Sequence, residues 1–306
     1  MHKGNTMLKA VSLLTAIVLW LYVMGEVDPE TRAKIGDIPV SLTNTEVLAD
    51  YGLAAAYDEQ LMISATVSGK RSDVNEVKKN GLTAYVDVSE CEKGTNEEKI
   101  VINLPSGVSL ENSSQSTLKL DVENRDSKTV PVEISFAEGD ASGDAVNNTV
   151  PWVLDQYPEE MTVTGAESIV AKVKQVEGTI PQDLAVYNKS KWVDVVLEPV
   201  NGKGRTLYGI ELDYDNAEAE IQRLTLKEAD LELTIDEEDE TTDFDKIDVE
   251  VPEKVRIVGT KKAIAEISKV EGTVTKDENG KINISVELPE NIYLMIGENN
   301  GKIIWN

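Results

Sequence analysis

The pattern of apolar and polar residues divides the chain near residue 25. A run without any charged residue extends from Ala10 to Met24 and is almost wholly apolar. The longer segment Met7–Gly25, which includes Lys9, has 19 residues. As a helix this segment spans roughly 28 Å, which is just enough for a hydrocarbon core. Beyond this run, apolar residues alternate with polar ones or recur at helical spacing, as in half-buried strands and amphipathic helices. The pattern therefore predicts a transmembrane anchor in residues 1–25, followed by globular domains.

The charges beside the apolar run predict the orientation of the anchor. Lys3 and Lys9 precede the run, and Glu26, Asp28 and Glu30 follow it. The positive-inside rule therefore places the short N-terminus in the cytoplasm and the bulk of the chain outside the cell membrane, as a single-pass protein. A cleaved signal peptide is the alternative. It requires small residues before the cut, whereas the exit from the run is bulky, so we expect an uncleaved anchor that is held by membrane lipid.

One face of the predicted helix carries small and hydroxyl side chains. Ser12, Thr15, Ala16 and Leu19 follow one another at i, i+3, i+4 and i+7. Small residues allow a second helix to approach closely in lipid, so this face is a candidate partner-binding surface. The alternative is that these residues are simply tolerated there, because such residues occur anywhere in a membrane helix.

A strand, a glycine and an amphipathic helix recur three times after the anchor. The copies are residues 63–77, 161–176 and 255–270. Their glycines, Gly69, Gly165 and Gly259, lie 96 and 94 residues apart, and apolar residues follow each glycine at +5 and +8. A period near 95 residues is too long for a solenoid and predicts tandem domains.

Further segments recur with the same spacing along the chain. Ile38-Pro-Val40 opens the first copy and Val130-Pro-Val132 the second, whereas the third has Leu224-Thr-Leu226 without the proline. Polar stretches near 125–128 and 222–223 separate the copies. We therefore expect mainly β (α+β) tandem domains, each with one short helix, at residues 26–124, 125–222 and 223–306.

The three glycines predict structural turns and not a phosphate site. A phosphate-binding loop requires two glycines and a Lys-Ser/Thr pair at fixed spacing, and the dinucleotide fingerprint requires three glycines. Neither pattern occurs in the chain. A glycine that ends a strand, so that the chain can turn into a helix, accounts for all three positions.

Composition excludes several function classes. The chain of 306 residues has 30 Lys+Arg against 56 Asp+Glu, which gives a formal net charge of -26. Nucleic acid is therefore a poor partner, because binding it requires a basic face. With one cysteine and one histidine, His2, the chain has neither an internal disulfide nor a Ser/His or Cys/His nucleophile pair. We expect no catalytic residue, no cofactor and no metal centre.

Two acidic features have structural interpretations as well. The run 236–245 concentrates carboxylates, but it lacks the spacing and the glycine of a calcium loop, so a solvated acidic loop is expected and cation binding stays open. Cys91 lies between Glu90 and Glu92, whose charges raise the pKa of a thiol. We expect Cys91 to be an incidental surface or edge residue.

Taken in order, these segments resemble the YbbR-domain family, the membrane-anchored regulators of the diadenylate cyclase of Gram-positive bacteria. The resemblance begins in residues 5–23 of the anchor. It continues through Ile38-Pro-Val40, Val130-Pro-Val132, the three glycine turns, and the Leu-Pro pairs at 104–105 and 288–289. It covers essentially the whole chain, and the third copy departs from it at its first strand.

The resemblance implies extracytoplasmic YbbR domains, each a small twisted β module similar to the C-terminal domain of a 5S-RNA-binding ribosomal protein. It also implies a non-catalytic regulator that binds an integral membrane diadenylate cyclase and modulates cyclic di-AMP synthesis. The alternative is a tethered module that binds cell-wall material or another exported protein. A carboxylate-only hydrolase has little support, because the sequence singles out no carboxylate pair.

Overall fold

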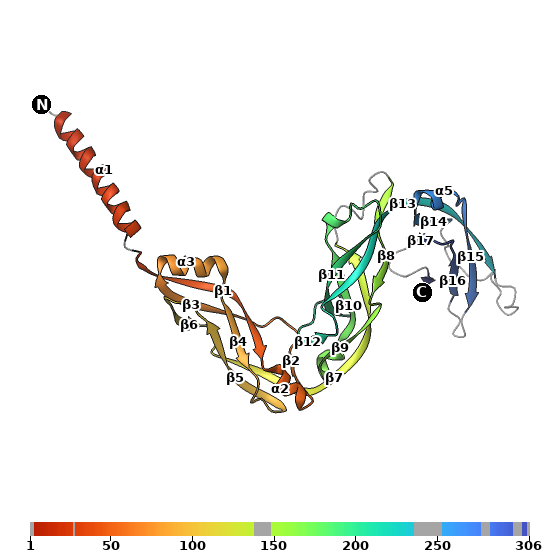
Figure 1. Ribbon diagram of the computed structural model, residues 1–306, viewed down its shortest axis with the longest axis horizontal. Coiled ribbons are helices and arrows are strands. Elements are labelled where there is room, and N and C mark those ends of the chain that lie inside the picture. The colour runs from red at the N-terminus through yellow and green to blue at the C-terminus, as the bar shows by residue number, and fades with distance from the viewer. Residues whose placement is uncertain are drawn as a thin grey trace. The chain divides into compact units, whose positions relative to one another are not determined.

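The structure, a computed structural model, describes residues 3–26, 28–137, 148–235, 253–276, 282–295 and 302–304. Its first element is the 24-residue helix α1 (Lys3–Glu26), which is red in Figure 1. Within the described ranges, no helix is both long enough and apolar enough to cross a membrane. The transmembrane anchor therefore stays a prediction.

The rest of the described chain is mainly β, as the sequence predicts, and contacts divide it into two compact units. Unit 1 comprises Met1–Val130, Thr162–Gln175 and Pro199–Asp213, and unit 2 comprises Pro131–Met161, Val176–Glu198 and Tyr214–Asn306. Four strands contribute residues to both units: β7 (Thr117–Phe136), β9 (Glu160–Ala166), β10 (Val173–Ile180) and β11 (Lys191–Asn201).

Unit 1 is built around strand β1 (Glu30–Thr43). The first half of β1 pairs antiparallel with β3, and its second half pairs parallel with β4. The two halves are separated by a register shift at Gly36 and Asp37, and Asp37 has a φ of 51°. The bulge thus turns one strand from one sheet into another. The other elements of unit 1 are α2 (Thr45–Asp50), β2 (Leu53–Ala56), β3 (Met62–Lys70), α3 (Arg71–Asn80), β4 (Thr83–Asp87), β5 (Gly94–Asn103), β6 (Val108–Ser113), α4 (Glu167–Val170) and β12 (Ile210–Leu212).

The core of unit 1 confirms the amphipathic pattern of the first copy. Helix α3 buries Val74 and Val77, with 0% and 2% of their surfaces exposed, against side chains from β1, β3 and β4. These are the two positions that the spacing after Gly69 predicts. Helix α2, which buries Leu48, is a second helix in this copy, so the expectation of one short helix in each domain is wrong here.

Unit 2 is organised around the long strand β13 (Asn216–Ile235). The first half of β13 pairs antiparallel with β8 on one side and β11 on the other. Its second half pairs antiparallel with β14 and parallel with β15. The remaining elements of unit 2 are β8 (Thr149–Tyr157), η1 (Gln182–Leu184), β14 (Lys254–Gly259), α5 (Lys261–Ala265), β15 (Lys269–Lys276), β16 (Ile282–Glu287), β17 (Ile292–Leu294) and β18 (Lys302–Ile304).

The same topology recurs in each copy of the repeat. An opening strand pairs parallel with the strand that follows the helix: β1 with β4, β7 with β10, and β13 with β15. The regions predicted as boundaries, near 125–128 and 222–223, fall inside the continuous strands β7 and β13. The last strand of one copy therefore continues as the first strand of the next, without a loop between them.

Candidate interaction sites

Helix α1 contains the four residues that the sequence predicts as a partner-binding face. Ser12, Thr15, Ala16 and Leu19 are all exposed, and their spacing places them on one side of the helix. The Thr15 hydroxyl donates a hydrogen bond to the Val11 carbonyl at 2.9 Å. Its polar group is thus satisfied within the helix, so the face can pack against an apolar surface without burying an unpaired donor.

The remaining surface of α1 is also apolar and exposed. Trp20 exposes 61% of its surface, Leu14 67% and Met7 73%. Monomeric soluble proteins rarely expose contiguous apolar patches of such size, and larger patches mark protein or membrane contacts. The described side chains of α1 thus form an exposed and mainly apolar surface.

A hydrogen-bonded contact joins the segment after α1 to helix α3. The Asp28 carboxylate accepts hydrogen bonds from the backbone N–H of Ser72 at 2.9 Å and from its hydroxyl at 2.5 Å. The backbone N–H of Arg71 donates to the Pro29 carbonyl at 3.1 Å. These bonds satisfy donors at the start of the helix. They also hold the pKa of Asp28 below its usual value, chiefly through the Ser72 hydroxyl. Sequence reasoning missed this contact, because 44 residues separate its partners.

The three repeat glycines contact the backbone of a facing turn. A β-carbon at Gly165 would lie 2.6 Å from the Gly209 carbonyl oxygen, and one at Gly259 would lie 2.9 Å from the Asn291 oxygen. Gly69 faces the Gly107 carbonyl in the same way. The facing residues have positive φ values between 62° and 83°. The described surroundings of each glycine are therefore protein backbone, packed too closely for any side chain.

Cys91 is buried, which contradicts its expected place on the surface or at an edge. Only 8% of its surface is exposed, and it belongs to the core of unit 1. Burial is the main cause that raises the pKa of its thiol to about 11, and the nearby Glu98 and Asp87 contribute further. A raised pKa was expected from the sequence, but the expected cause was the charge of the adjacent residues Glu90 and Glu92. A thiol with this pKa is a poor nucleophile at neutral pH.

Carboxylates form no metal centre in the part of the chain that the structure describes, where no three His, Cys, Asp or Glu side chains gather in a suitable cluster. The acidic run 236–245 lies outside the described residues. Cation binding by that run therefore stays an open question.

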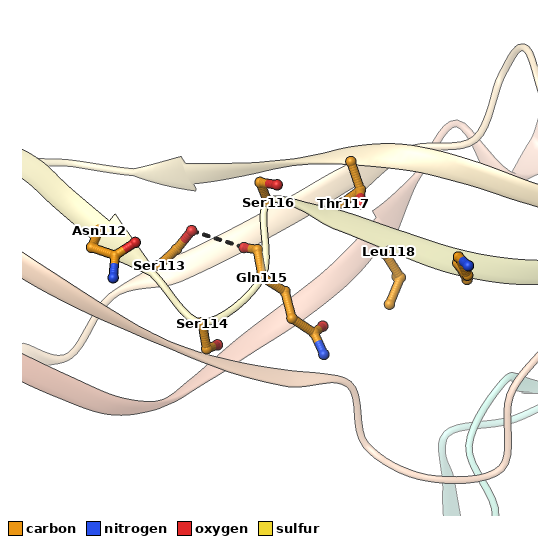
Figure 2. A pocket seen from close by; sticks show the side chains of 8 residues that line it. Asn112, Ser113, Ser114, Gln115, Ser116, Thr117 and Leu118 are labelled. Carbon is orange, nitrogen blue, oxygen red and sulfur yellow. Dashed lines mark hydrogen bonds between the residues drawn. The ribbon is translucent and has the colours of Figure 1, made fainter.

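A concavity of about 630 Å³ lies at the turn between β6 and β7 (Figure 2) and is lined by the consecutive residues 112–119. Its polar groups are already used to hold the turn. The Ser113 hydroxyl donates to the Gln115 carbonyl at 2.9 Å, as the dashed line in Figure 2 shows. Ser114 and Ser64 exchange two hydrogen bonds, which tie the turn to β3. The lining residues include no carboxylate, cysteine or histidine, and Lys119 is their one ionisable side chain.

Ion pairs and one aromatic ring connect separate segments of unit 1. The Lys172 ammonium lies 2.7 Å from a carboxylate oxygen of Asp58, and the Arg205 guanidinium lies 2.5 Å from a carboxylate oxygen of Glu59. Arg125 forms an ion pair with Glu211. Between these pairs, the Tyr57 ring and carbonyl lie directly against Gly209. This contact area joins residues 57–59 of the first copy to two segments of the second, and sequence reasoning did not predict it.

Comparisons with known proteins find one curated relative and several solved structures that are similar to the chain. The chain is 22% identical over 184 residues to the CdaA regulatory protein CdaR of Bacillus subtilis, a match that covers 56% of this chain and 37% of CdaR. A YbbR-like protein from Streptococcus pneumoniae is 12% identical, with a TM-score of 0.46 over 64% of this chain and 96% of that one. A YbbR-like domain from Listeria monocytogenes is 22% identical, with a TM-score of 0.26 over 31% and 94%. No protein-family model matches the chain.

The chain is similar to YbbR-like proteins and to the CdaA regulatory protein CdaR. The match to CdaR spans little more than a third of the length of that relative.

Proposed function

We propose that this chain is a non-catalytic regulator that binds an integral membrane diadenylate cyclase and modulates the synthesis of cyclic di-AMP. The observation that carries the proposal is the sequence match to a protein named as a regulator of CdaA. The low identity and partial coverage of that match are the reason why a direct test of binding is required.

In this proposal α1 is the contact with the cyclase. Its exposed apolar side chains lie in lipid, and the face of Ser12, Thr15, Ala16 and Leu19 packs against a transmembrane helix of the cyclase. The short N-terminus lies in the cytoplasm and the β modules lie outside the cell. The contact between Asp28 and Ser72 then joins the end of the anchor to the first module.

A role without catalysis follows from the residues available. The only histidine of the chain is His2, and the pKa of the only cysteine is raised to about 11. The described concavity at residues 112–119 is lined by no histidine, cysteine or carboxylate, which are the groups that most hydrolytic chemistry uses. Regulation then depends on two arrangements of the anchor that differ in their contacts with the cyclase.

The test is co-expression of the cyclase with the full chain and with two matched double variants. Ser12→Phe with Ala16→Phe places bulk on the proposed face, and Leu14→Phe with Leu21→Phe places the same bulk on the opposite side of α1. We expect the first variant to lose co-purification with the cyclase and to change the cyclic di-AMP level, and the second to behave as the natural chain. Equal co-purification by both variants would overturn the helix contact.

A tethered interaction module is the second candidate, because the β modules expose large surfaces that the anchor hypothesis does not use. Replacing residues 1–25 with an unrelated membrane anchor separates the two functions. A regulator that acts through α1 loses its effect on cyclic di-AMP, whereas a tethered module keeps its activity.

A further inference from the structure

One exposed sheet face of unit 2 carries aromatic and acidic side chains together. Strands β8, β13 and β11 lie side by side (Figure 1), and residues directly opposite each other point to the same face. Glu218 lies between Tyr157 and Asp194, and Glu220 lies between Asp155 and Trp192. We call these residues, with the Val196–Asn216 pair, the outer face: Asp155, Tyr157, Trp192, Asp194, Val196, Asn216, Glu218 and Glu220.

The burial of alternate residues shows that the outer face is the solvent side of the sheet. Ala217, Ala219 and Ile221 alternate with the outer residues of β13 and are almost fully buried. On the outer face, Tyr157 exposes 63% of its surface, Trp192 49% and Val196 68%. Exposed tryptophan and tyrosine side chains on one sheet face are costly in water, and such residues are enriched at the centres of protein interfaces.

The charges of the outer face have one sign. Its eight positions include four carboxylates and no lysine or arginine. Asp194 and Glu218 lie directly opposite each other, and so do Asp155 and Glu220. Like charges directly opposite one another destabilise a sheet. The face therefore has a negative potential that a partner of positive charge relieves on binding.

The first copy shows that the fold does not require this composition. Aligning the buried residues Leu120 and Val122 with Ala219 and Ile221 places Thr95 at the position of Trp192. By the same alignment, Lys99 corresponds to Val196, Lys119 to Glu218 and Asp121 to Glu220.

On the equivalent face of the first copy the charges balance, and side chains form hydrogen bonds with one another. Glu97 and Asp121 balance Lys99 and Lys119. Two cross-strand hydrogen bonds, from Thr95 to Asp121 at 2.6 Å and from Thr117 to Glu97 at 2.7 Å, connect its side chains. The aromatic and acidic composition of the outer face is thus absent from the equivalent face of the first copy.

We propose that the outer face binds a protein segment with exposed lysine or arginine side chains. The carboxylates supply charge complementarity, and the rings of Trp192 and Tyr157 add cation–π contacts to the bound cations. A neutral or anionic partner leaves the four carboxylates without counter-charges. The inference is independent of the cyclase contact, because the outer face belongs to the β modules and not to α1.

The test uses the full chain in a neutral detergent, because α1 exposes large apolar side chains. A capped peptide of about twelve residues in which lysine alternates with glycine is titrated by calorimetry, first near 0.02 M and then near 0.15 M salt, since screening weakens charge contacts. The graft variant Trp192→Thr, Val196→Lys, Glu218→Lys gives the outer face the residues of the first copy. We expect the graft to weaken binding by about tenfold or more, because it removes one aromatic contact, reverses the charge at residue 218 and adds a positive charge at residue 196.

The reciprocal graft Thr95→Trp, Lys99→Val, Lys119→Glu is the matched variant in the first copy, and it is expected to create a second binding site. Thermal unfolding and circular dichroism check that both grafts fold. Trp192→Phe with Glu218→Gln is a milder variant, which tests the same face if the graft unfolds. The matching peptide of glutamate and glycine is expected not to bind.

Three results would overturn the proposal. One is lysine-peptide binding that neither the graft nor the milder variant weakens. Another is the absence of lysine-peptide binding at both salt concentrations. The third is binding of a neutral oligosaccharide that the graft abolishes while the lysine peptide does not bind, which would make the outer face a carbohydrate surface. None of these results bears on co-purification with the cyclase, so failure here and failure of the proposed function are distinguishable.

Discussion

At the scale of single residues, the repeat glycines are required by close approach and not by backbone angle. None of Gly69, Gly165 and Gly259 has a positive φ, and each faces a carbonyl oxygen of a turn on a neighbouring segment. The positive φ belongs instead to the facing residue, which is Gly107, Gly209 or Asn291. The repeated unit is therefore a pair of positions that are far apart in sequence.

Gly165→Ala tests this pairing. The added methyl group meets the Gly209 carbonyl oxygen at 2.6 Å, so the backbone has to shift, and we expect the free energy of unfolding to fall by about 1–3 kcal/mol. Hydrogen exchange of the amides of β9 measures the loss. Gly202→Ala is the control, because nothing lies within 4 Å of its added methyl group, and it is expected to change stability by less than about 0.5 kcal/mol. Equal effects of the two substitutions would contradict the pairing.

Residue types alone predicted part of this picture. The positions of Gly69, Gly165 and Gly259 were found from sequence, because a strand, a glycine and a helix recur at nearly constant spacing. The contact partner of each glycine was not found from sequence, because a carbonyl 32, 38 or 44 residues away has no local signature. Cys91 shows the same limit: its charged neighbours in sequence suggested the surface, whereas its side chain lies in the core.

At the scale of elements, helix α3 depends on a side chain from another segment. Its own residue before the first turn, Lys70, makes no capping hydrogen bond through its side chain. Asp28 supplies that bond from outside the helix, and Asp28 lies two residues beyond the end of α1. The position of α3 is thereby connected to the end of the proposed anchor.

Asp28→Asn is expected to weaken this connection. In the folded chain the pKa of Asp28 is lowered by hydrogen bonds from Ser72, so its stabilising effect is present above about pH 4, the usual range for this group. It is lost as the pH falls through the lowered pKa. Hydrogen exchange of α3 between neutral and acid pH measures this change. We expect protection in the natural chain to fall in acid toward that of Asp28→Asn. Glu76→Gln, an exposed change on the same helix, should leave the pH profile unaltered, and an identical profile for all three proteins would contradict the contact.

At the scale of the whole molecule, the copies of the repeat are joined without loops. Strands β7 and β13 are each 20 residues long and serve as the last strand of one copy and the first of the next. In unit 1, Tyr57 against Gly209 and the ion pairs of Asp58 and Glu59 add side-chain contacts between the first copy and two segments of the second.

The ion pair of Asp58 and Lys172 tests the contribution of this contact area. Each charge change alone, Asp58→Lys or Lys172→Asp, is expected to lower the stability of unit 1, and the double variant is expected to recover part of the loss. Both side chains are nearly half exposed, so the coupling energy should be about 0.2–1 kcal/mol and should shrink in high salt. Urea unfolding of the four proteins at low and high salt measures it. Strictly additive losses would show that the two charges do not interact.

The sequence by itself predicted the mainly β fold class of this protein and its repeated strand–glycine–helix order. Periodicity along the chain directly reveals the apolar run, the repeat near 95 residues and the strand–glycine–helix pattern. Composition reveals the shortage of histidine and cysteine. Tertiary structure alone decided which residues meet: the turn behind each glycine, the buried thiol of Cys91, the contact between Asp28 and Ser72, and the outer face of β8, β13 and β11. These depend on strand register and on contacts between distant segments, and a register is visible only after the strands have paired.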